Sequence, residues 1–252
     1  MSPQHSDPTP VRSRREAFAA LKAELSGAAL GGLRVAVDAA VPSGIPELDR
    51  LLGGGVPRGT LVAMEGTAGA WSIAARLVAA VTSGALAAII DDGGLYPPTL
   101  AQAGTRLERV LVVPARSPLG MARAADILLR SRACRLVLMT APVLRAAVWS
   151  RLAALARRTG VVLIAVAAGA AAASLSAVAG LRLYCTRERL VVAGLRGLWS
   201  TVCGYVVRAE LRKTAARASG AAASLRVVTG DRAAALRERD IPRPRIARAA
   251  LR

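Results

Sequence analysis

Short, almost uninterrupted apolar runs alternate with helix-length segments through the middle of this chain, and this alternation constrains its fold most. Strands are predicted at residues 60–65, 85–91, 109–113, 135–140 and 161–167. Helices are predicted between them, at residues 71–82, 97–104, 119–132 and 144–158. Strands buried on both faces are typical of a parallel sheet with helices on either side. The pattern therefore predicts an α/β domain with a mostly parallel sheet, and residues 181–194 and 202–210 add an antiparallel edge.

The sequence divides into one domain and two flanking segments. A length of 252 residues suits one large domain with tails. Residues 1–33 are predicted to form a polar tail, a basic helix at 12–25 and a glycine-containing linker. The core domain is expected to span 34–211. Residues 212–252 are rich in arginine and alanine and are predicted to be a weakly structured basic tail with one helix at 231–239.

The charge balance points to an acidic partner. The chain carries 35 Lys and Arg against 16 Asp and Glu, a net charge of +19. Such a charge favours nucleic acid, an acidic protein face or an anionic membrane as partner. The simpler alternative is a biased codon usage combined with solubility, since arginine and alanine dominate together.

No metal site, secretion signal or membrane segment is expected. The cysteines Cys134, Cys185 and Cys203 lack metal-ligand spacing and suit a reduced, cytoplasmic interior. The N-terminus has no apolar core typical of a signal peptide. Residues 159–181 are uncharged, but alanine, glycine and serine dominate their second half, which predicts a buried strand followed by a small-residue helix.

A long motif precedes the first central strand. Residues 41–66 read VPSGIPELDRLLGGGVPRGTLVAMEG. Ser43 is predicted to cap a short helix that carries Leu48 and Asp49. The glycines at 53–55 are predicted to form a tight turn after that helix.

This motif resembles the start of the RecA family core, and the order of the following segments agrees with it. The similar stretches are residues 88–104, 107–114, 121–140 and 161–167, so that the resemblance covers about residues 41–210. The resemblance implies a RecA-like fold. It also implies a phosphate-binding loop after the first central strand, where ATP would bind in the family.

That loop departs from the family pattern at each residue that handles phosphate. An active loop reads G-x-x-x-x-G-K-[ST]. In the frame that starts at Gly66 and keeps Gly69, the second glycine is replaced by Trp71. Ser72 stands at the lysine position, and Ile73 stands where a hydroxyl would bind magnesium. An indole at the glycine position is expected to occupy phosphate space.

No shift of the frame restores the lysine, because the sequence has no lysine between Lys22 and Lys213. The acid that would end the fourth core strand is replaced by Thr140, and the water-activating glutamate falls on Gly93. Asp92 is the only nearby substitute, and a loop-capping role suffices for it. We therefore expect neither ATP hydrolysis nor a bound cofactor.

The two DNA-binding loops of the family's recombinases are also predicted to be short. The strand that ends at Thr140 leads almost directly into the helix at 144–158, and no basic residue follows residue 167 until Arg182. Strand exchange on DNA is therefore not expected.

A RecA-like scaffold without the ATP site and the DNA loops resembles the ImuA group, whose members are also called SulA-like. The resemblance implies a non-catalytic role in SOS-induced translesion DNA synthesis, near the nucleoid. It implies contacts with RecA, with a Y-family polymerase-like protein of the ImuB type, and with an alternative replicative polymerase.

Two segments are candidates for partner contacts. Phe18 and Leu21 lie on the predicted N-terminal helix, where they either dock on another protein or cover their own core. The C-terminal arginines either bind DNA phosphates or an acidic partner, or form a solvated tail. They are Arg237, Arg239, Arg243, Arg245 and Arg248.

Two other functions remain open at the level of sequence. A SulA-type inhibitor of cell division would make undamaged cells filament on overexpression. A non-specific DNA-binding protein would lose affinity steeply as salt rises.

Overall fold

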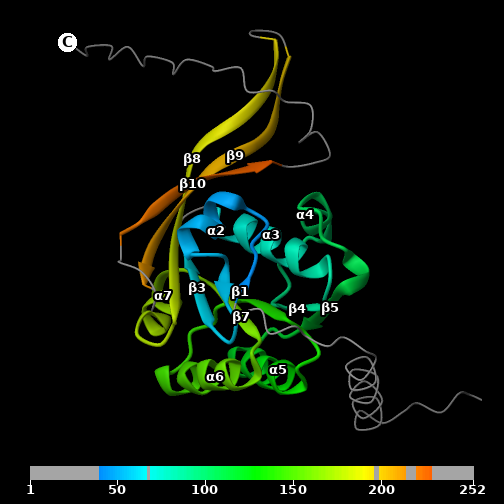
Figure 1. The fold of residues 1–252 in the computed structure, drawn as a ribbon. Coiled ribbons are helices and arrows are strands. Elements are labelled where there is room, and N and C mark those ends of the chain that lie inside the picture. Colours follow the sequence, from blue (N-terminus) through cyan, green and yellow to red (C-terminus); the bar gives the residue numbers. More distant parts are fainter. Residues whose placement is uncertain (1–39, 67–68, 196–198, 214–219, 229–252) are drawn as a thin grey trace, which may run out of the picture.

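The computed structural model describes residues 40–66, 69–195, 199–213 and 220–228, and its centre is a twisted sheet (Figure 1). In this part of the chain the sheet has eight strands in the order β10-β9-β8-β3-β7-β6-β4-β5. Their bounds are β3 Leu61–Glu65, β4 Ala87–Asp91, β5 Val110–Pro114, β6 Leu136–Thr140, β7 Val162–Ala167, β8 Leu181–Leu195, β9 Trp199–Lys213 and β10 Ala222–Val228. The six neighbouring strands β8, β3, β7, β6, β4 and β5 pair in parallel. At the other edge, β9 pairs antiparallel with both β8 and β10. The predicted mostly parallel sheet with an antiparallel edge is confirmed.

Helices cover both faces of the sheet, as predicted. Figure 1 shows α3 and α4 on one side of the parallel strands and α5 and α6 together on the other. The helices are α2 Pro46–Leu52, α3 Ala70–Thr82, α4 Pro97–Gln102, α5 Pro118–Ser131, α6 Ala146–Thr159 and α7 Gly169–Ser176, with a 3₁₀ turn at Leu107–Arg109.

The sheet separates two apolar cores, because successive side chains of a strand point to opposite faces. Ile89 of β4 packs in the core beneath α3, while its neighbour Ile90 packs in the core shared with α5 and α6. Trp149 of α6 is fully buried in the second core.

The segment before β3 forms the predicted short helix, but its cap differs from the prediction. Ile45, not Ser43, occupies the N-cap position of α2. The Ser43 hydroxyl instead bonds to the backbone of Ile45, and the Ser43 N–H donates to Asp49 Oδ1 at 2.8 Å. Gly53 then ends α2 in the left-handed conformation, so the predicted glycine turn is confirmed. The turn leads into a small antiparallel sheet of β1 (Ala40–Val41) and β2 (Val56–Pro57).

The long hairpin of β8 and β9 extends beyond the helix-covered part of the sheet in Figure 1. Both strands reach further than the predicted ranges of 181–194 and 202–210. Their register shifts between Arg182 and Leu183, between Arg187 and Arg189, and between Val191 and Val192. Such irregularities bend a strand and strengthen its twist.

The predicted boundary at residue 211 is wrong. β9 continues to Lys213, and β10, inside the segment predicted to be a tail, pairs with β9 over its full length. Leu225 of β10 is fully buried in the core that also holds Leu48 of α2. The strand was not predicted because the surrounding sequence is rich in alanine and arginine and has no strand-like pattern. It forms because β9 of the hairpin offers an edge with which it can pair.

The remaining predictions for the termini lie outside the described residues. These are the N-terminal segment at 1–33 with its helix at 12–25, and the helix at 231–239.

The uncharged stretch at 159–181 forms a strand and a short helix, β7 and α7, as predicted. Among the described residues, none of the helices combines the length and apolar character needed to cross a bilayer.

Removing β10 is expected to destabilise the domain, because Leu225 and the β9 edge lose their cover. In a chain that ends at Lys213, the free energy of unfolding should be at least about 3 kcal/mol lower than in the full chain. A chain that ends at Gly230 keeps β10 and should unfold like the full chain. Urea unfolding followed by circular dichroism measures both, and equal stability of the two truncated chains would contradict the assignment of β10 to the core.

Candidate functional site

The loop between β3 and α3 occupies a position where α/β proteins often bind anions. It follows the carboxyl end of a parallel strand and leads into a helix N-terminus, whose free N–H groups attract negative charge. Residues 67–68 lie outside the described part, whereas Gly66 and the turn from Gly69 onward are described. The Ile73 N–H donates to the Gly69 carbonyl at 3.0 Å and starts the helix.

Trp71 stands on the first turn of α3, with 43% of its surface exposed. It forms part of the wall of a pocket of about 410 Å³ at the carboxyl ends of β4 and β6. Other lining residues include Ile89, Asp91, Tyr96, Leu100 and Thr140. The indole therefore borders a cavity of ligand-binding size. Whether it also fills phosphate space stays a prediction.

Ser72, at the lysine position, is engaged with the hairpin. Its hydroxyl lies within hydrogen-bonding distance of the Tyr205 hydroxyl on β9. The guanidinium of Arg187 lies over the ring of the same tyrosine, 5.0 Å from its centroid. Ile73, at the position of the magnesium-binding hydroxyl, is fully buried in the core. Both side chains therefore serve the fold.

The two retained glycines of the loop are required by packing. A Cβ on Gly66, whose φ is +126°, would lie 1.8 Å from the Cys185 carbonyl oxygen of β8. A Cβ on Gly69, whose φ is +99°, would lie 2.7 Å from the Val207 methyl groups of β9. Close contact with the hairpin is therefore enough to require glycine at both positions, whether or not the loop binds phosphate.

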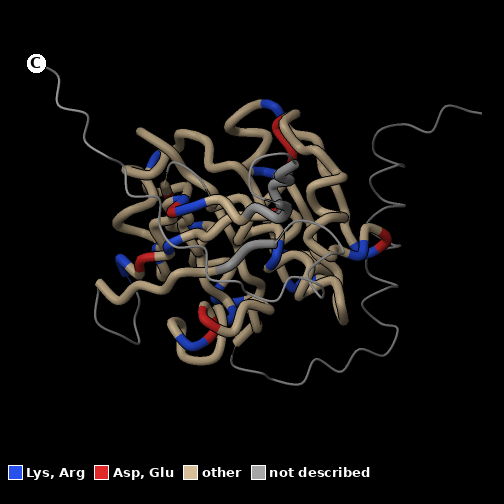
Figure 2. Tube along the Cα trace, turned by 90° about the horizontal axis from the view of Figure 1, so that it is seen from above, with Lys and Arg blue, Asp and Glu red and all other residues tan. Residues whose placement is uncertain are grey.

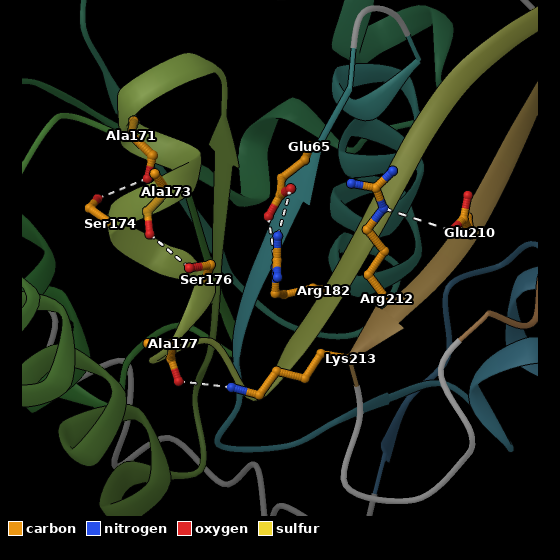
Figure 3. Close-up of polar contacts among 10 residues, drawn as sticks. All are labelled: Glu65, Ala171, Ala173, Ser174, Ser176, Ala177, Arg182, Glu210, Arg212 and Lys213. Carbon is orange, nitrogen blue, oxygen red and sulfur yellow. Dashed lines mark hydrogen bonds and ion pairs between the residues drawn. The ribbon is translucent and has the colours of Figure 1, made fainter.

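An ion pair joins β3 to β8 just below the loop, as Figure 3 shows. Glu65, the last residue of β3, is only 6% exposed. The Arg182 Nε and Nη2 atoms donate to its two carboxylate oxygens at 2.9 and 3.0 Å. Such bidentate contacts are strong and directional.

Cys185, on the same strand, is a buried free thiol. Burial, with a smaller contribution from the Glu65 carboxylate, raises the pKa of Cys185 to about 12. It therefore stays protonated at neutral pH and does not act as a nucleophile.

The acid after β4 caps its own loop. Asp91 Oδ1 accepts hydrogen bonds from the N–H groups of Gly93 and Leu95, both at 2.9 Å. Asp92 Oδ1 accepts a longer one, at 3.3 Å, from Gly94. The loop-capping role predicted for Asp92 is thus carried mainly by Asp91. Among the described residues, no group of three His, Cys, Asp or Glu side chains is arranged to hold a metal ion.

The segments at the positions of the recombinase DNA loops are short, as predicted. Helix α6 begins at Ala146, soon after β6 ends at Thr140. Between β7 and β8 the chain forms the alanine-rich helix α7. Neither connection holds a long basic loop.

The structure brings together the residues of the predicted loop but cannot place the predicted partner-binding residues. Phe18, Leu21 and the arginines of the C-terminal segment lie outside the described residues. Sequence reasoning missed Tyr205 and Arg182, which come from the hairpin. No local signal marks them, because only strand register brings them to the loop.

Solved structures identify the class of this fold. The crystal structure of the RadB recombinase matches with a TM-score of 0.58, covering 75% of this chain and 96% of that chain at 18% identity. At this identity the likeness concerns the fold. The chain thus has a RecA-like α/β fold.

Sequence comparisons give two further matches. The protein RecA of Picosynechococcus sp. (strain ATCC 27264 / PCC 7002 / PR-6) is 35% identical over 105 residues. The match covers 40% of this chain and spans only 30% of that curated relative. Residues 49–173 match the family described as the MT3502 N-terminal domain.

Replacing Gly66 with alanine tests the packing explanation for the retained glycines. We expect Gly66→Ala to lower the free energy of unfolding by roughly 3 kcal/mol or more, because the added Cβ meets backbone and φ is positive. Gly84→Ala is the matched control, since nothing lies within 4 Å of its Cβ. Thermal unfolding without nucleotide measures both. Equal midpoints would show that β8 does not constrain the loop.

Proposed function

We propose that this chain is a non-catalytic RecA-like accessory protein of SOS-induced translesion DNA synthesis. It acts through contacts with RecA and with a polymerase-like partner of the ImuB type. The observation that carries the proposal is the state of the loop: the lysine position is held by Ser72, whose hydroxyl meets Tyr205 of the hairpin.

Loss of the lysine removes the main cation for a triphosphate. A charge-assisted hydrogen bond contributes about 1.5–3 kcal/mol, and the lysine would make it to a highly charged ligand. The Tyr205 ring that meets Ser72 is itself covered by the guanidinium of Arg187, 5.0 Å from its centroid. This supports a loop that does not hold ATP.

Hydrolysis needs further groups that are replaced here. Phosphoryl transfer depends on a positioned metal and on a residue that orients water. Thr140 ends β6 where the family has an acid, and Gly93 stands at the glutamate position. The nearby Asp91 accepts two hydrogen bonds at Oδ1 from backbone N–H groups of its own loop.

What remains intact is the scaffold, and this supports a role in binding. Both apolar cores are well filled, and the hairpin is anchored by Glu65 and Arg182. Contacts with RecA and with polymerase-like proteins come from the resemblance to the ImuA group. The alternative replicative polymerase is a further candidate partner on the same ground.

A second candidate function, non-specific DNA binding, is favoured by the net charge of +19. Much of that charge lies on the described core, where basic residues outnumber acidic ones. Figure 2 shows its Lys and Arg positions spread around the core rather than gathered on one face. In a DNA-binding role, the arginines from Arg237 to Arg248 would add to this charge of the core.

Calorimetry tests the loss of ATP binding. We expect no heat of binding when the full chain is titrated with ATP and magnesium. A double variant, Trp71→Gly with Ser72→Lys, restores the glycine and the cation and should gain weak binding but no hydrolysis, because Gly93 and Thr140 remain. Tight ATP binding by the unaltered chain would contradict the proposal.

Capture from DNA-damaged cells tests the accessory role. The full chain should retain RecA and a polymerase-like protein, and nuclease treatment should leave both bound. Loss of both after nuclease treatment would favour the DNA-binding alternative. A chain ending at Gly230 keeps the folded core and shows whether the C-terminal arginines take part. Retention of neither protein before nuclease treatment would overturn the accessory role.

A further inference from the structure

The pocket beside Trp71 has a lining opposite in charge to the rest of the protein. Two carboxylates, Asp91 and Asp92, belong to it, and its lining contains no lysine or arginine among the described residues. The chain as a whole carries 35 basic against 16 acidic residues. The lining of this pocket therefore attracts positive charge, although the protein as a whole is basic.

Aromatic rings stand at the opening of this pocket. Tyr96 is 67% exposed and Trp71 is 43% exposed. Leaving such large side chains in water costs free energy that burial would recover. Exposed aromatic residues are enriched at protein-binding surfaces. The face of either ring also attracts a cation.

The inner wall of the pocket is apolar. Ala75, Ile89 and Leu100 belong to the lining and are almost fully buried. Val112, the register partner of Ile89 on β5, is exposed beside it and extends the apolar surface outward. A ligand with an aliphatic stem and a charged end matches both the wall and the opening.

The carboxylates are held in position. Asp91 accepts two backbone N–H groups and Asp92 accepts one, and all three bonds end on the Oδ1 atoms. A basic group also passes this loop: the Arg116 Nε lies 3.9 Å from the position of a Cβ on Gly93, although Arg116 does not line the pocket. Its charge opposes a cationic ligand and gives a handle for testing.

We propose that this pocket receives an arginine side chain of a partner protein. The guanidinium stacks against Trp71 or Tyr96 and pairs with the carboxylate of Asp91 or Asp92, while the aliphatic stem covers Ile89 and Leu100. Arginine fits better than lysine, because a planar guanidinium both stacks on rings and pairs with carboxylates. This inference deepens the proposed accessory function and rests on it for the nature of the partner.

The first test uses N-acetyl-arginine amide as the probe on the full chain. The indole N–H signal of Trp71 is followed by NMR and identified with Trp71→Phe. We expect a saturable shift with the arginine amide, a weaker one with N-acetyl-lysine amide, and none with N-acetyl-norleucine amide. No saturable shift, or an equal shift with the norleucine amide, would overturn the proposal.

Charge variants give matched controls for the same titration. Asp91→Asn keeps an Oδ1 acceptor for the backbone but removes the charge, and Asp92→Asn does the same at the next position. The double variant should bind the arginine amide about tenfold more weakly than the unaltered chain. Arg116→Gln should strengthen this binding. Unchanged affinity in both variants would also overturn the proposal.

Capture from damaged cells separates this inference from the proposed function. The Asp91→Asn, Asp92→Asn double variant should lose a partner that the unaltered chain retains, while its unfolding midpoint stays unchanged. Full retention would refute the arginine pocket and leave the accessory role standing. If the unaltered chain retains neither RecA nor a polymerase-like protein, the accessory role fails, and the titration alone decides on the pocket.

Discussion

The contact between β3 and β8 supports the hairpin and the loop together. β8 lies at the boundary between the parallel strands and the antiparallel edge, because it pairs parallel with β3 and antiparallel with β9. The bidentate pair of Glu65 and Arg182 sits at this boundary, and the Cys185 carbonyl lies so close to Gly66 that no side chain fits there. A buried charge of this kind is costly to leave unpaired, so the pair helps to hold β8 against β3. The neighbouring strand β9 brings Val207 against Gly69 and Tyr205 to Ser72, so that the loop packs against the hairpin.

This arrangement explains why the loop keeps some features of a phosphate-binding motif and loses others. Gly66 and Gly69 have positive φ angles and touch the hairpin, so any side chain there would be strained whatever the ligand. The positions of the lysine and the hydroxyl carry no such constraint. They are free to become Ser72, which meets the hairpin, and Ile73, which joins the core. A glycine pattern by itself therefore says little about nucleotide binding, since the same backbone geometry serves packing.

The distribution of charge distinguishes the pocket beside Trp71 from the rest of the protein. The net charge of +19 predicts an acidic partner, yet the basic positions of the described core are spread over its surface (Figure 2). The pocket beside Trp71 has the opposite character, with carboxylates and exposed aromatic rings. This contrast is the ground on which we propose an arginine side chain as the ligand of the pocket.

The sequence by itself determined the order of strands and helices from Leu61 to Ala167, because buried parallel strands and the helices between them have distinct periods. It also determined that the residues handling phosphate are replaced, since that motif depends on residue types at fixed local spacing. Only the tertiary structure decided the cap of α2, the strand β10 and the surroundings of the loop. Glu65 and Arg182 are 117 positions apart, and Ser72 and Tyr205 are 133 apart. Such pairs depend on the register of strands distant in sequence, and no local pattern of residues carries that information.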